Sequence, residues 1–196
     1  MTGSTAPDFR TTLRTVFLDR DGVINRKMPE GKYVTRWEEF ALLPGVPEAM
    51  ARLNHAGLRV LVLSNQRGVS LGLYTTADVD AIHTQLNRVL ATYGAKIDGF
   101  YFCPHDKQSC DCRKPLPGLF EQAKAQFAEI SVNTSVMIGD SASDIEFARN
   151  LSMPAIFLEG DAEAQAHRKP GSEKGATLAN LALATLPDAV DYLLAR

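Results

Sequence analysis

Acidic residues occur in two short runs whose composition suits a divalent cation. The first run is Asp19-Arg20-Asp21-Gly22, and the second is Gly139-Asp140-Ser141-Ala142-Ser143-Asp144. Carboxylate oxygens are the ligands that Mg²⁺ prefers, and it commonly takes one or two of them together with a substrate phosphate. Taken singly, each run is equally well explained as a turn or a helix cap, in which Asp, Ser and Gly are frequent.

Polar and basic residues between the two acidic runs are suited to bind a phosphoryl group. Ser64-Asn65-Gln66 offers short polar groups that can donate to an anion, and Arg113-Lys114 places two cations just before a predicted helix. A helix start carries partial positive charge, so cations beside it favour an anion such as phosphate. The alternatives are a capped turn and a solvated basic pair. Acids and cations at one point suit a metal and a phosphoryl group together.

The cysteines of this chain form one local cluster, Cys103, Cys110 and Cys112, with His105 among them. An odd number of thiols cannot all pair as intramolecular disulfides. Three thiolates and one imidazole complete the ligand set of a closed, structural zinc site. The alternative is three reduced thiols beside a surface histidine. We expect Zn²⁺ at these four residues. The other histidines are expected on the surface or in helix packing: His55, His83 and His167.

Short apolar runs alternate with helical periodicity along the chain. The apolar runs predict strands at 15–18, 58–63, 97–102, 135–138 and 154–158. Periodicity and proline start signals predict helices from 44, over 75–93, from 117, over 143–151 and over 186–194. The alternation predicts a doubly wound, three-layer α/β fold with a parallel sheet, and segment 159–175 is polar and rich in helix- and strand-breaking residues. Ligands of such sheets bind beyond the carboxyl ends of the strands, where the polar motifs fall.

Composition limits the classes of function. The 196 residues suit a single α/β domain, and 45% hydrophobic with 22% charged residues is ordinary globular composition. The net charge of −2 gives no electrostatic footprint for nucleic acid or an anionic membrane. No apolar run is long enough to span a bilayer, and the first residues lack the apolar segment of a signal peptide. We therefore expect a cytoplasmic protein with no nucleic-acid or membrane partner, and we expect it to be a monomer.

We expect one domain over residues 1–196. Its core covers about 14–160, with the zinc loop at 103–112 and a polar segment and final helix at 161–196. No internal repeat or linker divides the chain. The stretches 22–44 and 66–103 are too short to hold a large additional domain, which leaves any site at the strand ends open to solvent.

In order, the polar motifs resemble the four motifs of the haloacid dehalogenase (HAD) superfamily of phosphatases. The matching residues are Asp19-Arg20-Asp21-Gly22-Val23-Ile24, Ser64, Lys114 and residues 139–144, and the resemblance spans roughly 15–158. It implies a Rossmann-like HAD fold in which Asp19 is the nucleophile that forms an aspartyl-phosphate. It also implies that Asp21 is the acid that protonates the leaving group and then activates water.

The same resemblance implies the other catalytic roles. Ser64 and Lys114 would hold the phosphoryl oxygens. Catalytic Mg²⁺ would be bound by the Asp19 carboxylate, the Asp21 backbone carbonyl and Asp140, with Asp144 orienting this assembly. The resemblance also implies the residues that line the substrate site: Asn25, Ser64, Asn65, Gln66, Arg67, Arg113 and Lys114. Tyr33 and Trp37 would either contact the substrate or simply pack their loop.

The cysteine cluster directly before Arg113-Lys114-Pro115 resembles a zinc-containing branch of the superfamily without a large cap domain. Members of this branch act on heptose bisphosphates or histidinol phosphate. The resemblance implies removal of the 7-phosphate of D-glycero-D-manno-heptose 1,7-bisphosphate, with histidinol phosphate or another small sugar phosphate as the alternative substrate. A polynucleotide 3′-phosphatase and an inactive zinc-stabilised binding module are less favoured, because the charge is balanced and the catalytic residues are intact.

Three positions depart from the heptose branch, which leaves the substrate and its anomer open. Arg67 and Leu71 stand where that branch has a small residue and an arginine, and Ser141 replaces a basic residue. We expect Arg67 to supply the displaced cation. The short gap from His105 to Cys110 is closer to the histidinol phosphatase spacing.

Overall fold

A six-stranded parallel sheet forms the centre of the protein in the computed structural model, which describes residues 8–161, 164–165 and 173–195. The spatial order of the strands is β3-β2-β1-β4-β5-β6. Their bounds are β1 (Thr15–Leu18), β2 (Arg59–Asn65), β3 (Gly99–Cys103), β4 (Ser135–Gly139), β5 (Ala155–Leu158) and β6 (Leu181–Leu183). The predicted doubly wound parallel sheet is confirmed.

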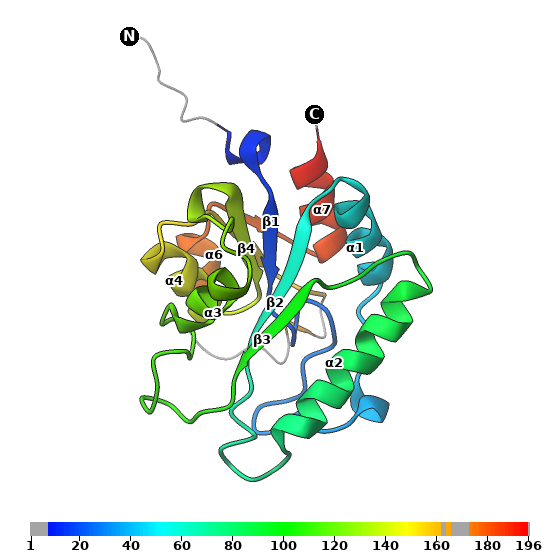
Figure 1. Ribbon diagram of the computed structural model, residues 1–196, viewed down its shortest axis with the longest axis vertical. Helices are drawn as coiled ribbons and strands as arrows, with labels where there is room; N and C mark the ends of the chain where they lie inside the picture. Colours follow the sequence, from blue (N-terminus) through cyan, green and yellow to red (C-terminus); the bar gives the residue numbers. More distant parts are fainter. Residues whose placement is uncertain (1–7, 162–163, 166–172, 196) are drawn as a thin grey trace.

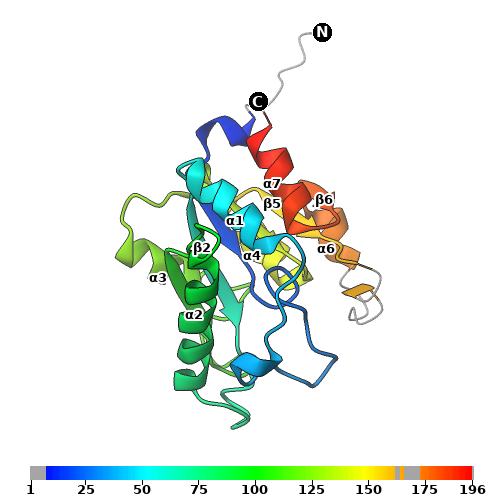
Figure 2. The same ribbon diagram turned by 90° about the vertical axis from the view of Figure 1, so that its right-hand side faces the viewer.

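Helices cover both faces of the sheet (Figures 1 and 2). One face is covered by α1 (Val46–His55), α2 (Thr76–Ala91) and α7 (Leu186–Leu194). The other face is covered by α3 (Gly118–Gln126), α4 (Ala142–Asn150) and α6 (Glu173–Leu178). Short 3-10 turns are η1 (Phe9–Thr12), η2 (Trp37–Glu39) and η3 (Val132–Thr134). The result is a three-layer sandwich, as predicted.

Two hydrophobic cores, one on each face of the sheet, result from the alternation of side chains along each strand. In β1, Val16 and Leu18 enter the core beneath α1, α2 and α7, whereas Phe17 enters the opposite core. All three are fully buried, and the Phe17 ring lies 5.8 Å from that of Phe120 in α3. Burial on both faces explains why the strands read as continuous apolar runs rather than as alternating ones.

The strand order reverses at β1, which lies between β2 and β4. Leu18 at the end of β1 is in register with Val62 of β2 and with Ile138 of β4. The loops that follow these three strands therefore meet at one edge of the sheet. In open α/β sheets this reversal is the place where ligands bind.

Several elements differ from the prediction. Residues 58–63 and 97–102 were expected as strands, but β2 and β3 run on to Asn65 and Cys103 because Ser64 and Asn65 pair with the end of β3. The β6 strand and the α6 helix were not predicted, since β6 is only three residues long and both follow a polar segment. The helix predicted over 75–93 is shorter, because α2 ends at Ala91, and Tyr93 beyond it is 48% exposed.

The histidines follow the prediction where the structure describes them. His55 is exposed at the end of α1, and His83 in α2 is buried with its ring stacked 4.2 Å from that of Phe100. Burial lowers the pKa of His83 to about 3, so this side chain is neutral packing. His167 lies outside the described residues. Within the described part of the chain, no helix is both long and apolar enough to cross a membrane.

Candidate active site

The ammonium group of Lys114 lies between two carboxylates at the carboxyl edge of the sheet. Its Nζ is 2.8 Å from Asp19 Oδ1 and 2.6 Å from Asp144 Oδ1, and it also donates to the backbone carbonyl of Leu63. Lys114 and Asp144 are both almost fully buried. Asp19 follows β1, Asp144 lies in the first turn of α4, and Lys114 precedes α3. One cation thus joins three segments that are distant in the sequence.

Asp19, Asp140 and Asp144 bring ligand oxygens within 4.8 Å of one another. Asp140 Oδ1 is buried and has no hydrogen-bond partner among the described residues. A Cβ on Gly22 would lie 2.3 Å from Asp140 Oδ2, so the approach of the two loops requires glycine there, as does its φ of +100°. Closely spaced carboxylates with an unpartnered buried oxygen fit Mg²⁺, which is bound through few carboxylates.

Burial sets the charge state of this cluster. It raises the pKa of Asp19 to about 7, against the opposing charge of Lys114. Burial also raises the pKa of Asp140, although Lys27 lies beside it. For Lys114, burial lowers the pKa, but Asp144 and Asp19 outweigh burial and leave it above its ordinary value. The charges of Lys114 and Lys27 thus do not fully offset the burial of Asp19 and Asp140, and a divalent cation would add positive charge beside them.

The environment of Asp21 lowers its pKa, whereas those of Asp19 and Asp140 raise theirs. Burial would raise its pKa, but the Arg20 charge and hydrogen bonds from Asn25 and Gln66 lower it overall. Arg20 Nη2 lies 2.9 Å from Asp21 Oδ2, and Gln66 Nε2 lies 3.0 Å from the same oxygen. Asn25 Nδ2 donates to Oδ1 at 3.0 Å. Asp21 is therefore held as an ionised carboxylate in one fixed orientation.

The orientation of the Gln66 amide also determines how Ser64 can act. Tyr74 OH and Arg20 Nη2 donate to Gln66 Oε1 at 2.7 and 3.2 Å, so the amide oxygen faces them. The amide nitrogen must then donate to Asp21 and, at 2.5 Å, to Ser64 Oγ. Because Ser64 is an acceptor in that bond, its own hydroxyl hydrogen is left free to bind another acceptor.

A polar pocket of about 230 Å³ adjoins this cluster through Asp21 and Lys27. Its lining also includes residues 28–34, Asn65, Gln66 and a cationic wall of Arg67, Lys107 and Arg113. Arg113 Nη1 is buried without a partner among the described residues, so it can receive an anion. Asn65 exchanges hydrogen bonds with the backbone of Lys114 at 3.0 and 3.1 Å, which fixes the loop that carries both cations.

Asn25 and Arg67, both expected to contact substrate, have other partners, and Trp37 takes the second of its two expected roles, the packing of its loop. Asn25 is completely buried and holds Asp21 and the carbonyl of Arg26, so it orients the acid and cannot touch a substrate. Trp37 does not line the polar pocket, and its ring stacks 5.2 Å from that of Phe40. Arg67 lines the pocket, but its Nε lies 2.6 Å from Asp106 Oδ1, so its charge is already paired.

Three residues of the site were missed by the sequence analysis. Arg20 is fully buried and Tyr74 nearly so, and both fix Asp21 through contacts described above. Lys27 Nζ lies 2.6 Å from Asp140 Oδ2. Arg20 could have been predicted as a site residue, because it lies between two motif aspartates in the sequence. Nothing in the sequence around Lys27 or Tyr74 indicates where the loops bring them.

The four predicted zinc ligands converge on one point. The Sγ atoms of Cys103 and Cys110 are 3.5 Å apart, as are those of Cys110 and Cys112. His105 Nδ1 is 3.6 Å from Cys103 Sγ and 3.2 Å from Cys112 Sγ. Tetrahedral zinc with ordinary bond lengths separates its sulfur and nitrogen ligands by roughly 3.6–3.8 Å. The geometry therefore fits a zinc ion held by three cysteines and one histidine.

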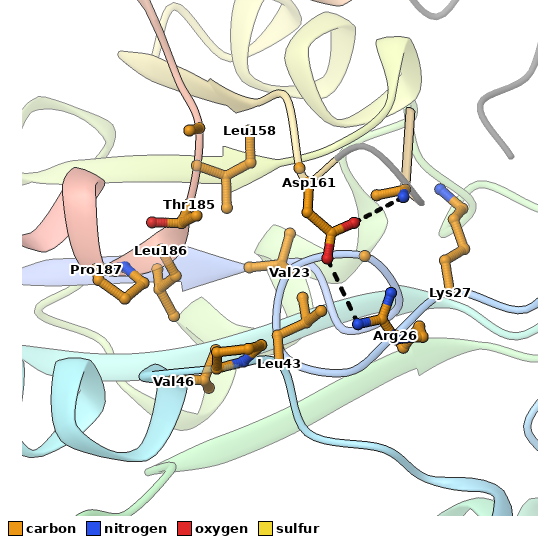
Figure 3. Close-up of a pocket in the computed structure, with 15 residues that line it drawn as sticks. Val23, Arg26, Lys27, Leu43, Val46, Leu158, Asp161, Thr185, Leu186 and Pro187 are labelled. Atoms are coloured by element: carbon orange, nitrogen blue, oxygen red, sulfur yellow. Dashed lines mark hydrogen bonds and ion pairs between the residues drawn. The ribbon is translucent and has the colours of Figure 1, made fainter. Parts of the chain in front are cut away.

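A separate apolar pocket of about 120 Å³ lies behind the turn that follows Asp21 (Figure 3). Val23, Leu43, Leu158 and Leu186 line it. Arg26 pairs with Asp161 at 3.4 Å beside it, while Figure 3 shows Lys27 extending separately from the same turn. The turn that carries Lys27 is thus packed against apolar side chains on one side.

Comparison with known families agrees with this arrangement of motifs on this fold. The sequence profile described as "Polynucleotide kinase 3 phosphatase" matches residues 15–169, which is most of the chain. The chain belongs to this family of HAD phosphatases. The match covers all four catalytic motifs and the zinc loop.

Named relatives of this HAD phosphatase share more specific descriptions. A protein of Mycobacterium tuberculosis named D-glycero-alpha-D-manno-heptose-1,7-bisphosphate 7-phosphatase is 43% identical over 141 residues, which are 71% of this chain and 74% of the relative. A protein of Vibrio cholerae named for the beta anomer is 35% identical over 187 residues, which are 91% and 95% of the two chains.

The solved structures also include a HAD phosphatase of that name. The crystal structure of D,D-heptose 1.7-bisphosphate phosphatase from B. bronchiseptica, complexed with magnesium and phosphate, matches with a TM-score of 0.79 and 28% identity. The match covers 93% of this chain and 98% of that chain.

The raised pKa of Asp19 predicts how stability depends on pH in magnesium-free buffer. A raised pKa in the folded state stabilises the protein below the unfolded pKa of 3.8, and this stabilisation is lost as pH rises through about 7. We expect the wild type to lose at least about 1.4 kcal/mol relative to Asp19→Asn between about pH 4.5 and about pH 8. Urea unfolding at each pH measures this difference.

The matched control for this measurement is Asp80→Asn, because Asp80 is exposed on α2. The stability difference between this variant and the wild type should change by less than about 0.5 kcal/mol over the same range. An equally flat difference for Asp19→Asn would contradict the assigned environment of Asp19.

Proposed function

We propose that this HAD phosphatase is a magnesium-dependent phosphomonoesterase that removes the 7-phosphate of D-glycero-D-manno-heptose 1,7-bisphosphate. The observation that carries the proposal is the placement of Asp19, Asp140 and Lys114 together, next to a polar pocket with a cationic wall that Lys27 and Asp21 also line. The names of the relatives at 35–43% identity support the heptose substrate.

In the first step, a carboxylate oxygen of Asp19 attacks phosphorus, and the bond from phosphorus to the sugar oxygen breaks. Lys114 holds Asp19 Oδ1, which leaves Oδ2 without a hydrogen-bond donor among the described residues. Asp21 gives its proton to the leaving alkoxide. Since its surroundings hold Asp21 ionised, we propose that the negative charge of the bound phosphate raises its pKa for this step.

In the second step, water attacks phosphorus of the aspartyl-phosphate, Asp21 takes the proton of that water, and Asp19 is released with inorganic phosphate. The free hydroxyl of Ser64 and the ammonium of Lys114 are placed to bind phosphoryl oxygens in both steps. The arrangement supports a base role for Asp21 directly, because its resting state is the carboxylate.

Asp19, Asp140 and the backbone carbonyl of Asp21 are the residues that would hold Mg²⁺, with Asp144 orienting Lys114 and Asp19. Bound Mg²⁺ would polarise the phosphoryl group and offset the charge of the acids. The Asp144 side chain is also used as the cap of α4, because its Oδ2 accepts hydrogen bonds from Ser141. This leaves only Asp144 Oδ1 facing the cluster.

The second phosphate of the substrate is proposed to bind at the cationic wall. Arg113 offers an unpartnered buried nitrogen, and Lys107 also lines the pocket. A guanidinium can bind a phosphate through two parallel hydrogen bonds. Tyr33 also lines the pocket, where it can contact the sugar. The relatives at 43% identity are named for the alpha anomer, so we propose that anomer.

The zinc loop is proposed to be structural, and the protein to be a cytoplasmic monomer of one domain. Four protein ligands leave no open position for a substrate on zinc. Reduced thiols suit a compartment in which disulfides are rare. The family description names an enzyme of nucleic acid ends, but the balanced net charge favours a small molecule over a nucleic acid.

A phosphate-release assay tests the substrate. The panel contains the alpha and beta heptose 1,7-bisphosphates, histidinol phosphate, fructose 1,6-bisphosphate and a 3′-phosphorylated oligonucleotide. We expect the alpha heptose to be preferred by tenfold or more in kcat/KM, which is about 1.4 kcal/mol. Preference for histidinol phosphate or the oligonucleotide would overturn the proposed substrate. Asp19→Asn should abolish turnover and leave the circular dichroism spectrum unchanged.

The acid role of Asp21 predicts a dependence on the leaving group. Asp21→Asn should slow release from the sugar bisphosphate by about 10²–10⁴-fold, because the alkoxide needs a proton. The same variant should slow the first turnover of p-nitrophenyl phosphate far less, because that phenolate leaves without one. Single-turnover kinetics with both substrates measure the contrast. Equal losses would show that Asp21 acts by some means other than proton donation.

The zinc site predicts one equivalent of zinc per chain after purification without chelators. Cys110→Ser should reduce the zinc content below about half an equivalent, because a structural site needs its full ligand set. Plasma emission spectrometry measures the metal. Ser109→Ala, beside the ligand, is the control and should retain zinc; zinc below half an equivalent in the wild type would rule out a tight site.

A further inference from the structure

Two lysines share the acidic cluster, and they contact different members of it. Lys114 is 3% exposed and pairs with Asp19 and Asp144. The Lys27 side chain is 35% exposed, and its Nζ lies 2.6 Å from Asp140 Oδ2. Lys114 is thus enclosed among protein groups, whereas Lys27 reaches the cluster from the solvent side.

Lys27 lies at the border between the acidic cluster and the polar pocket. It lines that pocket, which also contains the cationic wall with Arg113. It contacts only the Oδ2 atom of Asp140, and Oδ1 stays buried and without a partner among the described residues. A metal can therefore approach Asp140 from the other oxygen, while the Lys27 ammonium stays within reach of whatever enters the pocket.

The charges of the cluster explain why this position matters. Asp19, Asp140 and Asp144 carry three negative charges when ionised, and Lys27 and Lys114 carry two positive ones. The empty cluster is then negative by one charge, and a divalent cation makes it positive by one. A phosphate dianion is attracted to that positive cluster. Without Lys27, the empty cluster would bind the cation more strongly, and the loaded cluster would be neutral and bind phosphate less strongly.

We infer that Lys27 sets the balance between the two ligands that the cluster binds. Its charge beside Asp140 weakens Mg²⁺ binding to the empty site and strengthens phosphate binding once the metal is present. Arg67, the cation expected to face the phosphate, is paired with Asp106, whereas Lys27 directly contacts the motif aspartate. The inference rests on the magnesium site of the proposed function but not on the identity of the sugar.

Isothermal titration calorimetry with Mg²⁺ alone tests whether Lys27 weakens Mg²⁺ binding. Lys27→Met should bind Mg²⁺ at least fivefold more tightly than the wild type, in buffer without phosphate. Lys27→Arg keeps the charge and should stay within twofold of the wild type. The control is Lys32→Met, because Lys32 is exposed on the same pocket wall and has no contact with Asp140. It should also stay within twofold.

Titration with inorganic phosphate at saturating Mg²⁺ tests whether Lys27 strengthens phosphate binding. Lys27→Met should bind phosphate at least fivefold more weakly, whereas Lys27→Arg and Lys32→Met should change it less than twofold. The opposite signs of the two effects separate this role from a structural one, because a damaged site would bind both ligands more weakly. A thermal melt checks the fold, and Lys27→Gln replaces Lys27→Met if that variant is unfolded.

The outcomes separate this inference from the proposed function. If the wild type binds no Mg²⁺, both are overturned. If the wild type binds Mg²⁺ but Lys27→Met binds it equally or less tightly, only the role of Lys27 is overturned. The same holds if Lys32→Met matches Lys27→Met, since the effect would then come from the general charge of the pocket.

Discussion

The site depends on the buried ammonium of Lys114 and the two carboxylates beside it. Asp19 and Asp144 come from different ends of the chain, and without a cation between them their charges would repel in a buried environment. Removing one partner of such a group leaves an uncompensated buried charge, which is strongly unfavourable. Lys114 also binds the carbonyl of Leu63, so β1, β2 and α4 are held around one nitrogen atom. The position of Asp19, the proposed nucleophile, therefore depends on how the loop before α3 is held.

The fold was predictable where burial leaves a strong pattern. The strand β1 and the helix α7 were found with their observed bounds, because a continuous apolar run and a clear start signal mark them. The ends of β2 were not, because Ser64 and Asn65 belong to the strand through pairing with Phe102 and Cys103 of β3. Such pairing is a tertiary effect that composition does not contain. The β6 strand was also missed, because three residues are too few to show a period in the sequence.

The residues of the candidate site could likewise be predicted from the sequence only in part. The motif aspartates, Lys114 and the cysteine cluster could be found because residues of these types, in this order and at this spacing, rarely occur together by chance. Asn25 was assigned to the substrate because it follows the first motif, but the path of the loop directs it into the interior. For Trp37 the sequence left substrate contact and loop packing open, and the loop places its ring on Phe40. Lys27 is close to both residues in sequence, and the same loop brings it to Asp140. Proximity along the chain did not indicate which side chain would reach the cluster.

The zinc loop connects these parts of the molecule. It ends directly before Arg113 and Lys114, and a Cβ on Gly118 would lie 2.7 Å from the Cα of Cys112, so the loop packs closely against the start of α3. Asp106 within the loop pairs with Arg67, which joins the loop to the segment after β2. The loop that carries the zinc ligands therefore positions the buried cation and the cationic wall together. In the proposed active site, this shared attachment lets one loop position both Lys114, proposed to hold the reacting phosphate, and Arg113, proposed to bind the second phosphate.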